Sequence, residues 1–439
     1  MSRSIFDLSR VSLGALAGAS ALVAAPSAVL AGAFYVQEQS VRGAGRANSG
    51  EAAETGADSL WWNPASIARS GRELYVGAHG RLMSVDFTDQ GSTITRPLAP
   101  GGVTTPVGGD GDPDDVAADQ VIPNAAVALP VSDQLTVGLS VHRPFHLEYD
   151  FGDNSWARYD TIANKIEVTN FQGTVALRVN DWVDVGAGVS AIYTDAFLDA
   201  AYPNLMGPDG RSSLQAGDAW DYGWTVGAQA HLDRLSLGAS YRSSTEHDLD
   251  DGRFTLSGLV GPLASANFSQ PAQTSFRTPW SAVVAARYQI TPQLTLNGQV
   301  QRMGWSEYDA VRVTIGGATS AIAQDFEDTT VVAAGADYAI SPQWTVRAGV
   351  RYEPTPTIDA LREPGVADSD RWTAAVGGSM AISPAMSLDL ALGYVAFQGD
   401  RIYENAVFYP GTGADTTVQM RGRHDGNMTV LSAGLRWKF

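Results

Sequence analysis

The sequence contains no cysteine, few charged residues and no long apolar segment beyond its N-terminus. The absence of cysteine excludes disulfides, thiolate metal sites and cysteine nucleophiles. Charged residues make up 17% of the chain and the mean hydropathy is −0.09, which excludes a bundle of membrane-spanning helices. After residue 31, no segment approaches the roughly 18 apolar residues that a spanning helix needs. If the mature chain enters a membrane, it must therefore do so as a closed β-barrel.

Basic residues are also scarce. The chain has 29 Lys and Arg against 47 Asp and Glu, a formal net charge of −18. Such a surface repels phosphate backbones, so nucleic acid is not an expected partner. An acidic balance is compatible with an exported protein.

The N-terminus has the pattern of a secretory signal peptide. Arg3 and Arg10 form a basic region, and Val11–Ala25 is apolar and rich in small residues. Its core of about 15 residues is too short to span a bilayer. We predict that residues 1–31 are a signal peptide, cleaved after Ala31 or after Ala33.

From Arg72 onward, apolar residues recur with a period of two, as they do in half-buried strands. Clear examples are LSLGASYR at 235–242, WTVRAGVRY at 344–352 and SLDLALGY at 387–394. Periodicity alone leaves open whether the apolar face meets a second sheet or lipid.

The lengths of the connections favour lipid. Short turns are predicted at Val131–Gln134, Asn180–Trp182, Asp233–Arg234, Thr291–Gln293, Ser341–Gln343 and Ser383–Ala385. Long loops are predicted at Asp89–Gln120, Pro144–Asn164, Ala196–Asp218, Ser244–Thr278, Gly316–Asp328, Glu353–Asp370 and Asp400–His424. Strict alternation of short turns and long loops is typical of outer-membrane barrels. The prediction is an all-β fold, a 14-stranded antiparallel transmembrane β-barrel over residues 72–439.

Aromatic residues support this prediction. Trp182, Trp344 and Trp437 lie beside predicted short turns or the chain end, where an aromatic girdle is expected. The last predicted strand is apolar at alternate positions and ends on Phe439. That ending resembles the C-terminal signal read by outer-membrane assembly machinery, which is an expected partner together with outer-membrane lipid and lipopolysaccharide.

The stretch Gly43–Ala65, GAGRANSGEAAETGADSLWWNPA, has neither helical nor strand periodicity. An isolated segment of this kind could be a mobile linker. Before a barrel, a compact polar and aromatic segment is instead a natural plug, and Asn63-Pro64 favours a tight turn within it. We therefore predict that residues 32–71 form an N-terminal hatch in the lumen, ahead of the barrel at 72–439.

Several motifs resemble the long-chain fatty-acid transporter family of Gram-negative outer membranes, which includes aromatic-hydrocarbon channels (FadL/TodX-like, OMPP1 family). The motifs, in chain order, are Gly43-Ala44-Gly45-Arg46-Ala47 with Gly50-Glu51, Asn63-Pro64-Ala65, Pro144-Phe145, Trp224, Tyr241-Arg242-Ser243, Trp305-Ser306 and Asp368-Ser369-Asp370-Arg371. The resemblance implies a monomeric barrel with a hatch that contains Gly43, Gly45, Arg46, Asn63, Pro64 and Ala65. It also implies passive uptake of hydrophobic molecules and their lateral exit through a gap in the wall.

Pro144 is the candidate for that gap. Proline removes a donor from a strand ladder, so Pro144 either breaks the pairing or ends a strand at a loop. The predicted wall opening comprises Arg143, Pro144, Phe145 and His146.

Candidate residues for the substrate path are aromatic, apolar or basic. They are Trp61, Trp62, Phe197, Leu198, Tyr202, Arg178, Arg242, Arg347 and Arg351. Asp184 and Asp389 are expected to neutralise some of the arginines. In the two regions where the family's fatty-acid transporters place basic side chains, this chain has Asp195 and Gln324-Asp325 instead. The sequence therefore predicts a preference for neutral hydrocarbons, with fatty acids as the close competitor.

Other chemistry is less well supported. The Asp110–Asp115 segment, GGDGDPDD with its flanking glycines, partly resembles a calcium loop, but Pro113 and a missing distal Glu argue for a solvated loop. His142 and His146 lack a Glu partner for zinc. No catalytic residue, metal or cofactor is expected. The alternative functions are an outer-membrane barrel enzyme and a surface adhesin.

Overall fold

The structure is a computed structural model that describes residues 34–366 and 368–439. The predicted signal peptide and both predicted cleavage points lie outside these residues.

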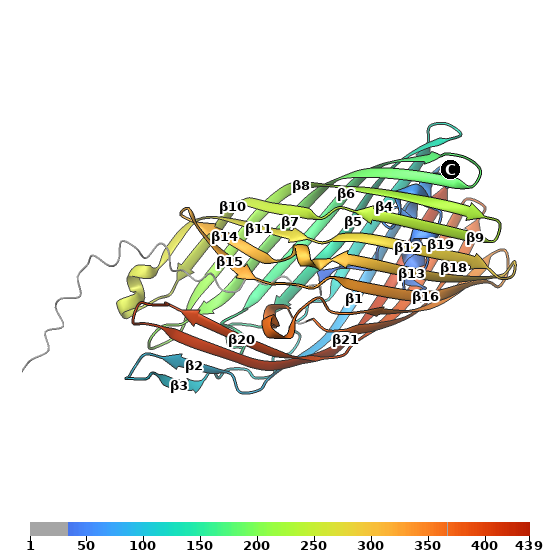
Figure 1. Cartoon of the computed structure of the whole chain (residues 1–439). Coiled ribbons are helices and arrows are strands. Elements are labelled where there is room, and N and C mark those ends of the chain that lie inside the picture. Colours follow the sequence, from blue (N-terminus) through green and yellow to red (C-terminus); the bar gives the residue numbers. More distant parts are fainter. Residues whose placement is uncertain (1–33, 367) are drawn as a thin grey trace, which may run out of the picture.

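Fourteen antiparallel strands close into one tilted barrel (Figure 1). In order around the wall they are β1 (Glu73–Asp89), β4 (Gln120–Pro130), β5 (Leu135–Asp150), β6 (Ala163–Arg178), β7 (Val183–Tyr202), β8 (Gly210–Leu232), β9 (Leu235–Arg242), β12 (Trp280–Gln289), β13 (Leu294–Gly304), β16 (Thr329–Ala339), β17 (Trp344–Glu353), β18 (Arg371–Ser383), β19 (Met386–Phe397) and β21 (Thr416–Lys438). Strand β21 pairs with the whole length of β1, from Glu73 to Asp89, and closes the cylinder. The predicted 14-stranded barrel is confirmed.

The remaining strands extend the wall within the long connections, at the end of the barrel opposite the C-terminus (Figure 1). They are β2 (Thr93–Arg96), β3 (Val103–Pro106), β10 (Thr245–Ser257), β11 (Phe268–Thr278), β14 (Ala310–Ile315), β15 (Ala318–Ala323) and β20 (Asp400–Phe408). Short 3-10 helices accompany them: η6 (Gly261–Ala266), η7 (Trp305–Glu307), η8 (Asp359–Leu361) and η9 (Pro364–Val366).

The six predicted short turns are confirmed, but the predicted loops Ala196–Asp218, Ser244–Thr278 and Asp400–His424 consist mostly of strand, and Pro144–Asn164 does so in part. Strand β5 continues through Pro144 to Asp150, and β7 and β8 leave only residues 203–209 outside strands in the predicted loop Ala196–Asp218. These strands continue beyond the part in which apolar and polar residues alternate, because the surroundings of both strand faces change there. Their inner side chains pack on a cluster inside the barrel, and their outer side chains no longer need to be apolar.

The outer face of the wall shows whether the apolar side of the strands meets a second sheet or lipid. Leu139, Val189 and Leu390 are 65%, 70% and 52% exposed on the outside, and no second sheet covers them in the described part of the chain. Trp182, Trp344 and Trp437 are exposed beside the short turns or the chain end. This outer surface matches the apolar band and girdle of a membrane barrel. Between residues 34 and 439, leaving residue 367 aside, no helix is long and apolar enough to cross a bilayer.

Residues 34–70 are almost entirely buried inside the barrel, nearer to the end that carries the C-terminus (Figure 1). They form α1 (Val41–Ala44) and three 3-10 helices, η3 (Glu51–Ala53), η4 (Ala57–Ser59) and η5 (Pro64–Ile67). We call residues 34–71 the lumenal segment.

Candidate functional site

The turn at Asn63-Pro64-Ala65 joins the lumenal segment to the wall. The Asn63 side-chain oxygen accepts a hydrogen bond of 2.9 Å from the backbone N–H of Ala65 and so caps η5, in which Pro64 occupies the first position. Its amide nitrogen donates to the carbonyl oxygens of Ala52, at 2.7 Å, and of Ala228 in β8, at 3.0 Å. One asparagine thus shapes the turn and holds it against the barrel.

Glycines on the inner wall let the lumenal backbone approach closely. A Cβ atom on Gly186 of β7 would lie 2.5 Å from the carbonyl carbon of Pro64. One on Gly377 of β18 would lie 2.7 Å from the Cα atom of Gly45. Sequence reasoning missed these positions. The sequence signal that could have revealed them is a high glycine content together with glycines at inward positions of the strands.

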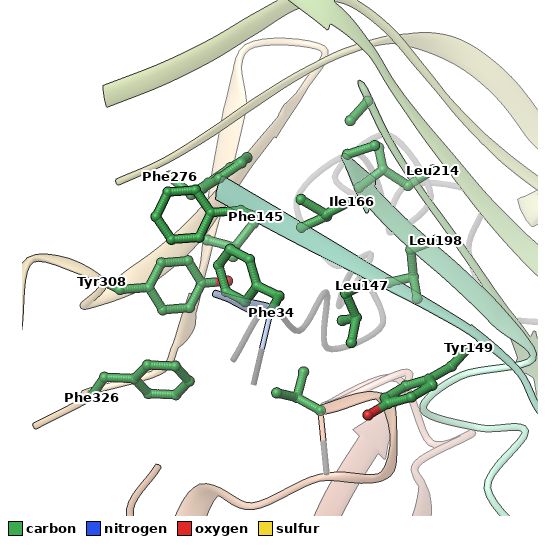
Figure 2. Close-up of a cluster of buried hydrophobic side chains, with 14 of the residues drawn as sticks. Phe34, Phe145, Leu147, Tyr149, Ile166, Leu198, Leu214, Phe276, Tyr308 and Phe326 are labelled. Carbon is green, nitrogen blue, oxygen red and sulfur yellow. The ribbon is translucent and has the colours of Figure 1, made fainter. Parts of the chain in front are cut away.

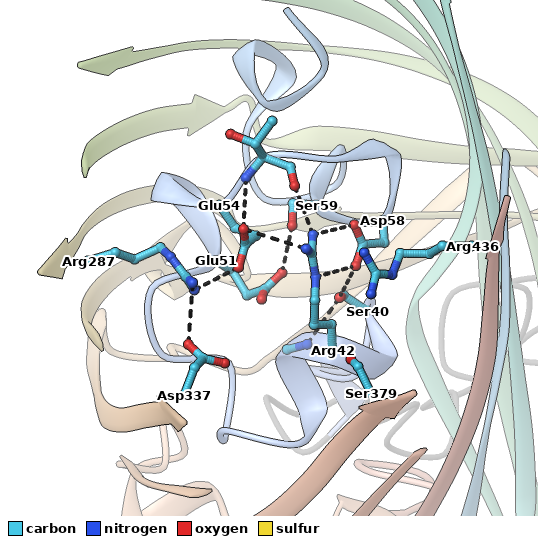
Figure 3. Close-up of polar contacts among 12 residues, drawn as sticks. Ser40, Arg42, Glu51, Glu54, Asp58, Ser59, Arg287, Asp337, Ser379 and Arg436 are labelled. Atoms are coloured by element: carbon cyan, nitrogen blue, oxygen red, sulfur yellow. Dashed lines mark hydrogen bonds and ion pairs between the residues drawn. The ribbon is translucent and has the colours of Figure 1, made fainter. Parts of the chain in front are cut away.

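Buried ion pairs connect the lumenal segment with the wall (Figure 3). The fully buried Arg46 contacts Glu51, Glu54 at 3.0 Å and Asp337 of β16 at 3.2 Å. Arg287 of β12 contacts the same Glu54 at 2.7 Å and Asp337 at 3.3 Å. Because an unpaired buried charge is very costly, these residues favour one docked position of the segment.

The wall is irregular at Pro144. Pairing of β5 with β4 ends at Val141, and the register with β6 shifts between His142 and Phe145. Arg143 and Pro144 therefore both oppose Thr169, which defines a β-bulge. The alternative that Pro144 ends the strand is wrong.

The β5 edge that β4 leaves free is covered from inside by the start of the lumenal segment. The backbone N–H of Val36 donates to the carbonyl oxygen of Pro144 at 2.8 Å, and Tyr35 forms an isolated bridge with Phe145. Arg143 pairs with Glu167 at 2.8 Å, and a ring nitrogen of His146 lies 3.6 Å from the same residue. The four residues predicted for the opening thus lie at one discontinuity of the wall.

A large apolar cluster fills the barrel next to this discontinuity (Figure 2). Phe34 lies at its centre, with its ring centroid 5.2 Å from that of Phe145 and 5.6 Å from that of Trp305. Other members are Trp61, Trp62, Leu147, Tyr149, Ile166, Leu198, Tyr202, Leu214, Phe276, Tyr308 and Phe326. Leu198 and Tyr202 belong to β7, so the prediction that they lie on a loop is wrong, whereas Phe197 points to the other face of that strand.

The four candidate arginines have different surroundings. Arg347 contacts Asp337 at 2.7 Å, and Arg351 lies 3.5 Å from both Glu38 and Glu353. Arg178 ends β6 beside a short turn.

The two carboxylates expected to neutralise candidate arginines form ion pairs with other arginines, although Asp389 reaches Arg347 through Ser379. Asp184 contacts Arg69 at 2.6 Å, and Asp389 contacts Arg436 at 2.7 Å. Arg242 has no carboxylate partner among the described residues and instead donates to Gln172 and to the carbonyl oxygen of Trp61.

Sequence reasoning also missed an acidic cluster between the long connections. Asp160, Glu363 and Glu404 offer oxygen atoms that all lie within 4.8 Å of one another. Burial raises the pKa of Asp160 to about 7 and the pKa of Glu363 well above its usual range. Neutral, protonated carboxyl groups can hydrogen-bond one another, so the cluster can fasten neighbouring connections together. Asp160 lies more than 200 positions before the other two residues, and no local motif indicated the cluster.

An apolar outer band, alternating short and long connections and an occupied lumen define an outer-membrane β-barrel protein. The model of the family described as "Outer membrane protein transport protein (OMPP1/FadL/TodX)" matches residues 21–439, and the chain belongs to this family. The resemblance inferred from the motifs is confirmed. The protein is located in the Gram-negative outer membrane.

Curated relatives and solved structures agree with this assignment. The long-chain fatty acid transport protein of Salmonella typhi is 24% identical, with 87% of this chain and 91% of the relative covered. Outer membrane protein P1 of Haemophilus influenzae is also 24% identical, covering 88% and 90%. A Pseudomonas aeruginosa FadL homologue has a TM-score of 0.79 at 22% identity, covering 92% and 99%. The Pseudomonas putida toluene transporter TodX has a TM-score of 0.67 at 17% identity, with the same coverage.

Proposed function

We propose that this protein takes up hydrophobic small molecules passively and releases them sideways into the outer membrane at Pro144. The names of its relatives, which are long-chain fatty acid and toluene transporters, support this class of substrate. The observation that carries the lateral route is the bulge in β5, where pairing with β4 stops beside the apolar cluster.

The physical argument rests on what each route offers to an apolar solute. Burial of the solute's surface in an apolar site gains about 25 cal/mol per Å², so binding of the solute to the apolar cluster is favourable. Towards the C-terminal end, the solute would meet the ion-paired lumenal segment. We propose that this segment, within residues 32–71, is the hatch that blocks an axial path. Sideways, the solute meets the edge of β5, which Tyr35 and Val36 cover, and then lipid.

The register suggests a sharp test of the lateral route. Deletion of Pro144 would leave Arg143 alone opposite Thr169 and restore one-to-one pairing. His142 and Phe145, both buried, would then keep their inward direction because one residue would separate them. We expect this variant to assemble but to lose most uptake of a labelled hydrophobic substrate by cells.

Pro144→Val is the matched control because it restores a backbone donor but keeps the extra residue. We expect it to retain the bulge and much of the uptake. Heat-modifiable mobility on gels would establish that both variants form barrels. Normal uptake by a correctly assembled deletion variant would refute the lateral route, while absence of uptake by the wild type would refute transport itself.

A further inference from the structure

We propose that Arg242 forms an anion site beside the wall opening and binds the carboxylate of an amphipathic acid in transit. This inference rests on the proposed transport function and specifies the class of its substrate. It reverses the preference for neutral hydrocarbons that the sequence predicted.

The first observation is the environment of the Arg242 guanidinium. It stacks on the Trp61 ring at 3.6 Å from the centroid and donates to the Trp61 carbonyl oxygen at 2.8 Å and to the Gln172 side-chain oxygen at 3.0 Å. All these partners are neutral. An arginine has five N–H donors, so these two hydrogen bonds leave capacity for an anion.

The contrast with other arginines that face the lumen is informative. Arg46, Arg347 and Arg351 each have carboxylates within ion-pairing distance. They are therefore committed to ion pairs within the wall or between the hatch and the wall. A cation removed from water is stabilised by a counter-ion. No carboxylate of the described residues forms an ion pair with Arg242.

The second observation is the crevice that Arg242 lines. It joins the arginine to Pro144 and Phe145 at the bulge, and Ile192 and Met303 supply further apolar wall. About 30 Å³ of space remains, which is room for one or two water molecules or a small head group but not for an acyl chain. A bound acid would therefore place its carboxylate here and its tail along the neighbouring apolar residues, with some of them displaced.

The position of the crevice gives the site a role in transport. The cation lies on the route between the apolar cluster and the opening, so it can hold the polar end of an acid while the tail moves towards lipid. Charge-assisted hydrogen bonds from a planar guanidinium suit a carboxylate, and Trp61 keeps that plane oriented. A neutral hydrocarbon gains nothing from the arginine.

The test compares hexadecanoate with its methyl ester, which has the same tail but no charge. Binding of both would be measured on the purified full chain in a nonionic detergent at pH 8. We expect the wild type to bind the acid more tightly than the ester. Arg242→Gln should weaken acid binding about 10- to 100-fold and leave ester binding within about twofold.

Two further variants make the outcome decisive. Arg242→Lys keeps the charge and should retain part of the preference for the acid. Arg302→Gln removes an arginine that pairs with Asp328 elsewhere and should leave both affinities unchanged.

Equal binding of acid and ester by the wild type would overturn the proposal even if Arg242→Gln failed to fold. Equal weakening of both ligands by Arg242→Gln would also overturn it, because the arginine would then only support Trp61. Ester uptake by cells would still establish transport in either case.

Discussion

Adding one methyl group to the inner wall should loosen the hatch without harming the barrel. In Gly186→Ala, the new Cβ would lie 2.5 Å from the carbonyl carbon of Pro64 and 2.6 Å from the nitrogen of Ala65. Ordinary contacts begin at about 3.4 Å, so the turn must retreat by about 1 Å. Overpacking of this kind costs about 1–3 kcal/mol. The better strand preference of alanine is the same whether the hatch is docked or not, so it does not offset this cost. The cost of about 1–3 kcal/mol falls on docking of the hatch and should raise the undocked population about 5- to 150-fold.

Single-channel recordings in planar bilayers would measure this effect as more frequent or larger openings. Gly298→Ala is the matched control, because a Cβ there meets no atom within 4 Å and the flanking Asn297 and Gln299 point inward. Thermal unfolding should show that both barrels remain intact. If Gly186→Ala and Gly298→Ala conduct alike, and hydrogen exchange in residues 34–71 is also unchanged, then close packing at Gly186 does not hold the hatch.

Two further predictions concern charged groups. Asp337→Asn should destabilise hatch docking by about 3–5 kcal/mol, because Arg46 and two wall arginines lose a shared buried carboxylate. Hydrogen exchange in the hatch would report it, and Asp328→Asn, at an exposed pair, should cost less than about 1 kcal/mol. For Asp160, whose pKa of about 7 is raised above an unfolded value of about 3.9, the stabilising contribution is complete below pH 4 and is lost as the pH rises through 7. Proteolysis of the outer connections should therefore accelerate between about pH 4 and 7 in the wild type, and Asp160→Asn should reduce that dependence.

Much of the barrel could be predicted from the sequence because its physical demands repeat along the chain. Lipid requires an apolar residue at every second position of each spanning strand, and the two lengths of connection mark the two sides of the membrane. These rules gave the six short turns and the 14 strands. They do not hold above the membrane, and for that reason β5 and β7 were predicted to end before they do.

The candidate site was less predictable because it depends on contacts between distant residues. A local rule could identify Asn63-Pro64 as a turn, and proline in a strand could mark position 144. No local rule shows that Arg347 pairs with Asp337 whereas Arg242 has no acidic partner within residues 34–366 and 368–439. That difference depends on the register of strands around the closed barrel, and it decides which arginine can meet a ligand.

The distribution of charge inside the barrel favours a sideways exit for an apolar molecule. An axial path would separate pairs such as Arg46 with Asp337 or Glu54 with Arg287, the latter 2.7 Å apart, and each broken buried pair costs about 3–5 kcal/mol. The lateral path requires that Tyr35 and Val36 leave the β5 edge. One backbone hydrogen bond from Val36 to Pro144 holds them there, together with hydrogen bonds from Trp61 and Gln301 to the Tyr35 hydroxyl and the local packing. A net backbone hydrogen bond is worth about 1 kcal/mol. Under the proposed function, the hatch therefore resists displacement most strongly where charges pair, and an apolar molecule leaves most easily at the bulge beside the apolar cluster.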